Sequence, residues 1–117
     1  MTYILVNPNS GYTEEHDTLA AAVAAGLTYD GFTYSVREDE ETPGRWGLFT
    51  SSASRNGTMY RGEADTGVSV AAAGEAEAHD ALMLAWHERH PRAPHMRYDY
   101  IEIWPAAEWA RFLEDAA

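Results

Sequence analysis

The stretch from Gly74 to Trp104 constrains the fold of this chain more than any other part of its sequence. Its first half repeats apolar residues every three or four positions, with acidic and polar residues between them. This spacing predicts an amphipathic helix over residues 75–90, with carboxylates in its first turn and basic side chains in its last turn, before Pro91. The apolar stripe consists of Ala78, Ala81, Leu82, Ala85 and Trp86.

A strand is expected after this helix, over residues 96–104. Its tyrosines and Trp104 alternate with Ile101 and Ile103, which is the pattern of a strand covered on both faces. We therefore expect Tyr98 to Ile103 to lie centrally in the sheet. The residues of this unit that are expected to be buried are Leu82, Trp86, Ile101 and Ile103.

The rest of the chain predicts more strands and two further helices. Strands are expected at residues 3–6, 32–37, 46–51 and 58–61, whereas residues 65–72 are ambiguous. Turn formers separate these strands, including Asn56-Gly57, which is typical of tight hairpins. Helices are expected over residues 13–26, beginning at Thr13 and ending at Gly26, and over residues 106–115, after Pro105.

A weak internal similarity links the two halves of the chain. Glu14, His16, Asp17, Leu19 and Ala22 recur 63 positions later as Glu77, His79, Asp80, Leu82 and Ala85. If each set lies on a helix between two strands, the order is that of a ferredoxin-like sheet with an extra hairpin and a terminal helix. Alanine and leucine match easily by chance, so whether the repeat is real stays open. The expected fold is one α+β domain over residues 1–117, with a mainly antiparallel sheet of four to six strands.

The charge of the chain limits what it can bind. It carries 19 acidic and 8 basic residues, for a formal net charge of -11, and all the basic residues are arginine. Direct nucleic-acid binding is disfavoured, because phosphate backbones are bound by basic patches. The absence of cysteine excludes disulfides and thiolate metal sites. No apolar run is long enough for a signal peptide or a membrane span, so we expect a cytoplasmic protein that does not contact membranes.

Two histidines are each followed by an aspartate, and a carboxylate beside an imidazole can support general base catalysis. These pairs are His16-Asp17 and His79-Asp80. Adjacent helix residues point about 100° apart, so neither pair is expected to form a dyad.

His87, His90 and His95 do not have the spacing of a zinc-binding helix, and Pro91 interrupts them. Glycine patterns that cradle phosphates and the nucleophile elbow of serine hydrolases are also missing. We therefore expect no catalytic residue, no metal and no cofactor, and we interpret the chain as a protein that is not an enzyme.

Carboxylates gather in the turn between two predicted strands and in a following loop. Folding does not require such a run, and like charges repel, so solubility or binding is expected to account for it. Spaced carboxylates can also imitate the phosphates of DNA in a basic groove. The residues expected to contact a partner are Glu38, Asp39, Glu40, Glu41, Glu63 and Asp65. A basic segment, residues 89–97, is the second choice for a contact surface.

These patterns favour a small acidic protein that binds and inhibits a basic, nucleic-acid-handling protein, as phage anti-CRISPR proteins and other DNA mimics do. No motif identifies such a protein. Two alternatives stay open: a small ligand-binding or regulatory α+β domain that uses its aromatic sheet, and, less favoured, an enzyme that uses histidine with a carboxylate. A homodimer is compatible with each of them.

Overall fold

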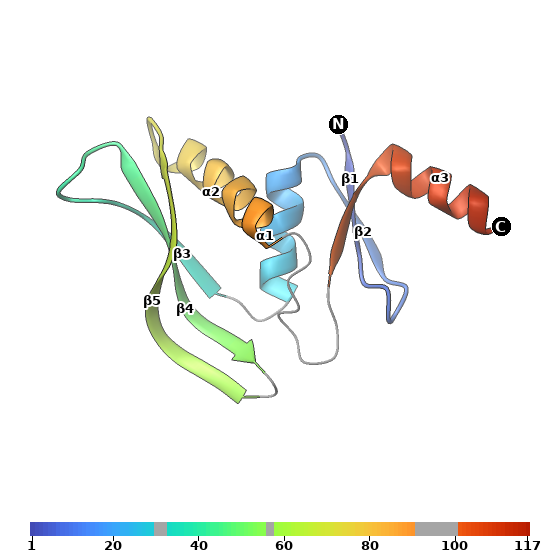
Figure 1. The fold of residues 1–117 in the computed structure, drawn as a ribbon, viewed down its shortest axis with the longest axis horizontal. Helices are drawn as coiled ribbons and strands as arrows, with labels where there is room; N and C mark the ends of the chain where they lie inside the picture. The colour runs from blue at the N-terminus through green and yellow to red at the C-terminus, as the bar shows by residue number, and fades with distance from the viewer. Residues whose placement is uncertain (30–32, 56–57, 91–100) are drawn as a thin grey trace.

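We analysed a computed structural model of the chain, which describes residues 1–29, 33–55, 58–90 and 101–117 (Figure 1). The elements in chain order are β1 (Tyr3–Val6), β2 (Thr13–His16), α1 (Leu19–Tyr29), β3 (Thr33–Glu38), β4 (Arg45–Arg55), β5 (Thr58–Ala71), α2 (Glu75–Arg89), β6 (Glu102–Pro105) and α3 (Ala106–Ala116).

The described strands form two antiparallel sheets of three strands each. The first sheet has the order β2-β1-β6, and the second is the meander β3-β4-β5. The predicted α+β class with antiparallel pairing is therefore confirmed. The ferredoxin-like arrangement is not confirmed, because it requires the strands of both βαβ units to share one sheet.

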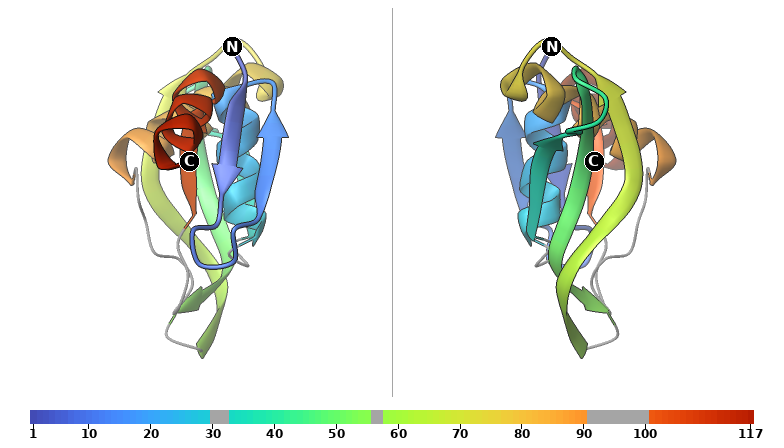
Figure 2. Two further views of the ribbon diagram at one scale, coloured as in Figure 1. Left: turned by 90° about the vertical axis from the view of Figure 1, so that its right-hand side faces the viewer. Right: turned by 90° about the vertical axis from the view of Figure 1, so that its left-hand side faces the viewer.

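Helices α1 and α2 lie between the two sheets (Figure 1). Helix α1 packs on the β2-β1-β6 sheet, α2 packs on the β3-β4-β5 sheet, and the two helices contact each other. Helix α3 covers the other face of the first sheet, against β1 and β6. Figure 2 shows the two ends of this stack, with α3 and β1 nearest the viewer on one side and the long strands β4 and β5 on the other.

Helix α1 begins later than the sequence predicted. Residues 13–16 form strand β2, which pairs with β1, so Thr13 is not the N-cap. Thr18 has that role, because its Oγ1 accepts a hydrogen bond from the backbone N–H of Ala21 at 3.1 Å. Glu14 and His16 thus lie on a strand, whereas Glu77 and His79 lie on α2, and the internal similarity does not correspond to a structural repeat.

Gly26 does not end α1, which continues to Tyr29. The glycine is buried against β1, where a Cβ atom would lie 3.6 Å from Cδ1 of Leu5. This is an ordinary van der Waals distance, so alanine would also fit at this position. Leu27, which follows it, is also helical and is 2% exposed.

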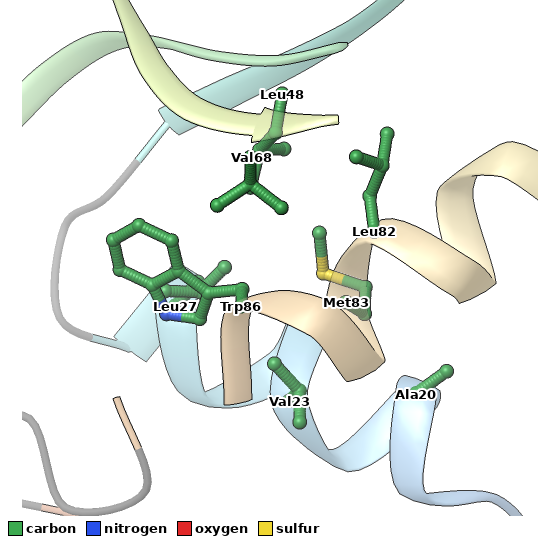
Figure 3. Close-up of a cluster of buried hydrophobic side chains, with 8 residues drawn as sticks. All are labelled: Ala20, Val23, Leu27, Leu48, Val68, Leu82, Met83 and Trp86. Atoms are coloured by element: carbon green, nitrogen blue, oxygen red, sulfur yellow. The ribbon is translucent and has the colours of Figure 1, made fainter. Parts of the chain in front are cut away.

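The hydrophobic core lies between α1, α2 and the β3-β4-β5 sheet (Figure 3). It consists of Ala20, Val23, Leu27, Leu48, Val68, Leu82, Met83 and Trp86. Burial of Leu82 and Trp86 confirms the prediction for this helix. Met83 lies beside the predicted stripe and is nevertheless fully buried, because α2 packs against α1 as well as against the sheet.

Strand β6 lies at an edge of its sheet and pairs with β1 alone among the described strands. The prediction of a central strand is therefore wrong for its described part, and residues 98–100 lie outside the described residues. Ile101 and Ile103 are half-buried instead of buried, and Ile103 packs against the margin of the core. Residues 65–71, which were ambiguous, belong to β5, while the predicted Asn56-Gly57 turn lies outside the described residues.

Helix α3 follows Pro105 as predicted, but none of its side chains is fully buried. Trp109 and Phe112 pack on Trp104 of β6, with ring centroids 5.4 and 5.3 Å from that of Trp104. Phe112 and Leu113 remain 48% and 50% exposed. Among the described helices, none combines the length and the apolar character that crossing a membrane requires.

Candidate functional site: a hollow on the outer face of the β3-β4-β5 sheet

Side-chain alternation gives the β3-β4-β5 sheet two different faces. The helix-facing side carries Tyr34, Val36, Trp46, Leu48, Val68 and Val70, all in or against the core. The intervening residues lie on the outer face, since successive side chains of a strand point to opposite sides. Those of the central part of the sheet are Arg37, Arg45, Gly47, Phe49, Gly67 and Ser69. Three of these six are glycine or serine, so this part of the outer face has little side-chain volume.

An open hollow of about 760 Å³ lies on this outer face. Its lining residues are Arg37, Glu38, Asp39, Glu40, Thr42, Arg45, Trp46, Gly47, Phe49, Asp65, Gly67 and Ser69. The register explains the hollow, because Gly47 of the central strand pairs with Arg37 on one side and with Ser69 on the other. The small residues form the floor, and the longer side chains and the turn after β3 form the walls.

The ring of Phe49 extends over the space that Gly47 leaves empty. A Cβ atom at Gly47 would lie 3.0 Å from Cε2 of Phe49, which is closer than side chains normally approach. The guanidinium carbon of Arg37 lies 4.0 Å from the centroid of the same ring. This distance is well within the range of a cation–π contact, about 6 Å. The hollow therefore contains an aromatic surface on which a guanidinium already stacks.

Arg45 forms another part of the wall and is held away from the ring. Its Nη2 donates a hydrogen bond to Oγ of Ser69 at 2.9 Å. Its backbone also closes the preceding turn, since its N–H donates to the carbonyl of Thr42 and its carbonyl accepts from the N–H of Asp39. The two arginines of the hollow thus have different partners, Phe49 for Arg37 and Ser69 for Arg45.

Two acids of the turn 38–41 form hydrogen bonds that support the turn itself, which the sequence did not predict. Oε2 of Glu38 accepts a hydrogen bond from the N–H of Gly44 at 2.8 Å, and Oδ1 of Asp39 accepts one from the N–H of Glu41 at 2.9 Å. Gly44 has a φ of 86°, a value that favours glycine. The carboxylates of Glu40 and Glu41 are exposed and form no hydrogen bond with any residue that the structure describes.

Four of the six predicted partner-binding residues line the hollow together: Glu38, Asp39, Glu40 and Asp65. Glu41 lies in the same turn but outside the lining, and Glu63 lies on β5, with its side chain outside the described part. Asp65 is brought to the site because it pairs with Phe49 across β4 and β5. Its Oδ1 also accepts a hydrogen bond from the N–H of Gly67 at 2.8 Å.

The sequence interpretation missed the eight other lining residues, among them the long side chains of Arg37, Arg45 and Phe49. Their alternation with Val36, Trp46 and Leu48 was a usable signal, because it places them on the face opposite the core. What the alternation could not show is that three neighbouring positions of that face are small.

A second polar cluster lies on the helix-facing side of the same sheet. Nε2 of His79 is 2.7 Å from the hydroxyl of Tyr34, and its Nδ1 is 3.0 Å from Oδ1 of Asp80. The prediction that His79 and Asp80 do not meet is wrong, because the two side chains turn toward each other despite the angle between their Cα–Cβ bonds. Burial raises the pKa of Tyr34, and the negative charge of Asp80 raises it further.

The partner of His16 is Glu14 and not its sequence neighbour Asp17. Its Nε2 lies 2.6 Å from Oε1 of Glu14, because residues two apart on a strand point to the same side. Oε2 of Glu14 also accepts a hydrogen bond from the hydroxyl of Tyr12 at 2.8 Å. This contact joins the two ends of β2.

The two described histidines at the end of α2, His87 and His90, have separate surroundings. The ring of His90 stacks on Trp86 with centroids 4.0 Å apart, and burial lowers the pKa of His87. Within the described part of the chain, no three histidine or acidic side chains come together as metal ligands do. Of the basic segment 89–97, Arg89 donates a hydrogen bond to the carbonyl of Gly67 at 3.2 Å, and residues 91–97, which include His95, lie outside the described residues.

Comparison of the chain with protein-family models, with curated proteins and with solved structures finds no match.

Proposed function

We propose that this chain binds a positively charged protein through the hollow on the outer face of the β3-β4-β5 sheet. One observation carries this proposal. Acidic residues that are far apart in the sequence, the turn 38–40 and Asp65, line the same hollow, whose wall includes the aromatic ring of Phe49. The carboxylates attract basic side chains, and the aromatic ring supplies apolar contact area for them.

The electrostatics of the rest of the molecule support the same partner. The net charge of -11 accelerates the approach of a basic surface, since opposite charges steer association. In the acidic turn, Glu40, which lines the hollow, and Glu41 beside it are exposed and form no hydrogen bond with any described residue. They can therefore rearrange toward a partner without a loss of internal hydrogen bonds.

The partner that fits best is a nucleic-acid-handling protein, and the effect of binding is inhibition. Such proteins present basic grooves that bind phosphates, and a rigid acidic domain in that groove excludes the nucleic acid. The volume of the hollow also lies in the range of small-molecule sites, about 300–1,000 Å³. Small-molecule sites are mostly apolar, however, whereas this hollow is walled by charged residues, which favours a protein partner.

The test uses protamine, an arginine-rich DNA-binding protein, as a defined basic surface. Its association with the chain is measured by surface plasmon resonance over a range of ionic strength. We expect the double substitution Glu40→Gln and Glu41→Gln to slow association several-fold and to weaken its salt dependence. Duplex DNA added in solution should compete with the chain for protamine.

The matched control changes the same number of charges on α3, where Glu114 and Asp115 are also exposed. Glu114→Gln with Asp115→Asn alters the net charge equally and leaves the hollow intact. If both double variants slow association to the same extent, only the net charge matters and the hollow is not the binding site.

The Tyr34–His79–Asp80 cluster is the observation that favours the enzyme alternative. Asp80 holds Nδ1 of His79, and Nε2 is thereby set as the acceptor of the tyrosine proton, as a general base requires. Tyr34 faces the helices, however, and the hollow lies on the opposite face of the sheet. Hydrolysis of 4-nitrophenyl acetate that is lost in His79→Gln would favour an enzyme; an unchanged rate in this variant would assign the cluster to stability.

A further inference from the structure

We infer that the hollow selects arginine over lysine side chains of its partner by stacking the guanidinium on Phe49. This inference rests on the proposed function and adds the chemistry of the side chain that is bound.

The contact between Arg37 and Phe49 shows that a guanidinium can stack on this ring. Its guanidinium carbon lies 4.0 Å from the ring centroid, so a planar cation already occupies this position in the free protein. The contact is diagonal across the strand pair, because Arg37 pairs with Gly47 while Phe49 pairs with Ser35. Since Gly47 has no side chain, Arg37 and Phe49 meet over it.

The ring of Phe49 is accessible from the hollow, so a partner's cation can replace Arg37 there. Phe49 lines the open hollow together with the small residues Gly67 and Ser69, which add little side-chain volume to it. Arg45 does not compete for the ring, because its Nη2 is hydrogen-bonded to Ser69. A partner's side chain that enters the hollow therefore reaches the ring of Phe49 in place of Arg37.

Arginine suits this surface better than lysine for three physical reasons. Its guanidinium is planar and can lie flat on an aromatic ring, it is less strongly hydrated than an ammonium group, and its donors can bind a carboxylate in bidentate fashion. Asp65 lies on the strand next to Phe49, and Glu40 lines the same hollow. An aromatic face with carboxylates nearby is therefore expected to bind an arginine side chain more tightly than a lysine side chain.

Arg37 is then an internal competitor for the partner's arginine. Its removal should strengthen the binding of arginine, by freeing the ring and by removing a positive charge. Arg45 is the matched control, because it lines the same hollow with the same charge but does not contact the ring. Both Arg37→Gln and Arg45→Gln remove one positive charge from the hollow, but only Arg37→Gln also uncovers the ring of Phe49.

The experiment measures the dissociation constants of oligo-arginine and oligo-lysine peptides of equal length by fluorescence anisotropy. We expect the wild-type chain to bind the arginine peptide more tightly. We expect Arg37→Gln to strengthen arginine binding about two- to fivefold more than Arg45→Gln does, as a single cation–π contact predicts. Phe49→Leu, which keeps an apolar side chain, should reduce the preference for arginine.

Three outcomes would overturn the inference. Equal affinity for both peptides, lost when Glu40 and Glu41 become glutamine, leaves the proposed function standing and removes the arginine preference. Equal effects of Arg37→Gln and Arg45→Gln mean that charge alone acts. If neither peptide binds, the proposed function and the inference both fail. The peptide comparison uses the wild-type chain, so it decides the question even if Phe49→Leu does not fold.

Discussion

The hydroxyl of Tyr34 lies 2.7 Å from Nε2 of His79, a residue 45 positions further along the chain. Because the carboxylate of Asp80 can only accept a hydrogen bond, Nδ1 of the neutral imidazole carries the proton, and Tyr34 donates to Nε2. The contact joins β3 to the first half of α2. It therefore links the second sheet to the helix layer by a hydrogen bond in addition to apolar packing.

Tyr34→Phe should lower the free energy of unfolding by about 0.5–1.5 kcal/mol, the usual contribution of one hydrogen bond. In a double-mutant cycle with His79→Ala, most of this loss should disappear once the histidine is absent. Urea denaturation measures all four variants. Additive losses would show that the two residues act independently.

Acidification should destabilise the protein through His87, whose pKa is lowered by burial from its ordinary value of 6.5. The unfolded chain then binds a proton at a higher pH than the folded chain does. The contribution of this group is fully favourable above pH 6.5, decreases as the pH falls through that value, and stops changing below the folded pKa.

Denaturation measured at several pH values should show this loss of stability, and it should be smaller in His87→Gln. NMR titration of the His87 ring reports the folded pKa directly. A titration midpoint at or above the ordinary value would contradict the prediction.

The acidic turn should separate into residues that stabilise the fold and residues that do not. Glu38→Gln and Asp39→Asn weaken hydrogen bonds to backbone N–H groups, and we expect each to cost up to about 1 kcal/mol, since both side chains are exposed. Glu40→Gln and Glu41→Gln should leave the melting temperature unchanged or raise it slightly, because they relieve repulsion. A similar loss in all four variants would refute this division.

The core should be far more sensitive to truncation than the terminal helix. Met83→Ala removes a fully buried side chain of α2 and should cost about 2–5 kcal/mol. Leu113→Ala on α3, where half of the side chain is exposed, should cost less than about 1 kcal/mol. Chemical denaturation compares the two variants, and equal losses would mean that α3 is covered in solution, for example by a second copy of the chain.

Local sequence patterns were sufficient to predict those helices and strands whose formation depends mainly on their own residues. The helix from Glu75 to Arg89 has a complete apolar stripe and a proline after it, and both are visible in the sequence. The carboxylates of the turn 38–41 were likewise visible, and they indicated part of the candidate site. Alternation predicted β3, because a polar and an apolar face are built into its six residues.

The start of α1 could not be predicted in this way. Residues 13–16 carry acids that suit the first turn of a helix as well as an exposed strand. Pairing of Thr13 with Val6 and of His16 with Tyr3 makes them a strand, and this pairing depends on a neighbour that only the folded chain provides.

The sequence by itself therefore determined the α+β class, the extent of α2 and α3, and the acidic, lysine-free surface, because periodicity and composition act over a few residues. Only the tertiary structure decided that the strands divide into two sheets and that β6 is an edge strand, since side-chain alternation does not specify which strand lies alongside. The tertiary structure also determined where the hollow forms. Gly47 lies on β4, whereas Gly67 and Ser69 lie two residues apart on β5, and their small side chains make a cavity only when the register places the two strands together.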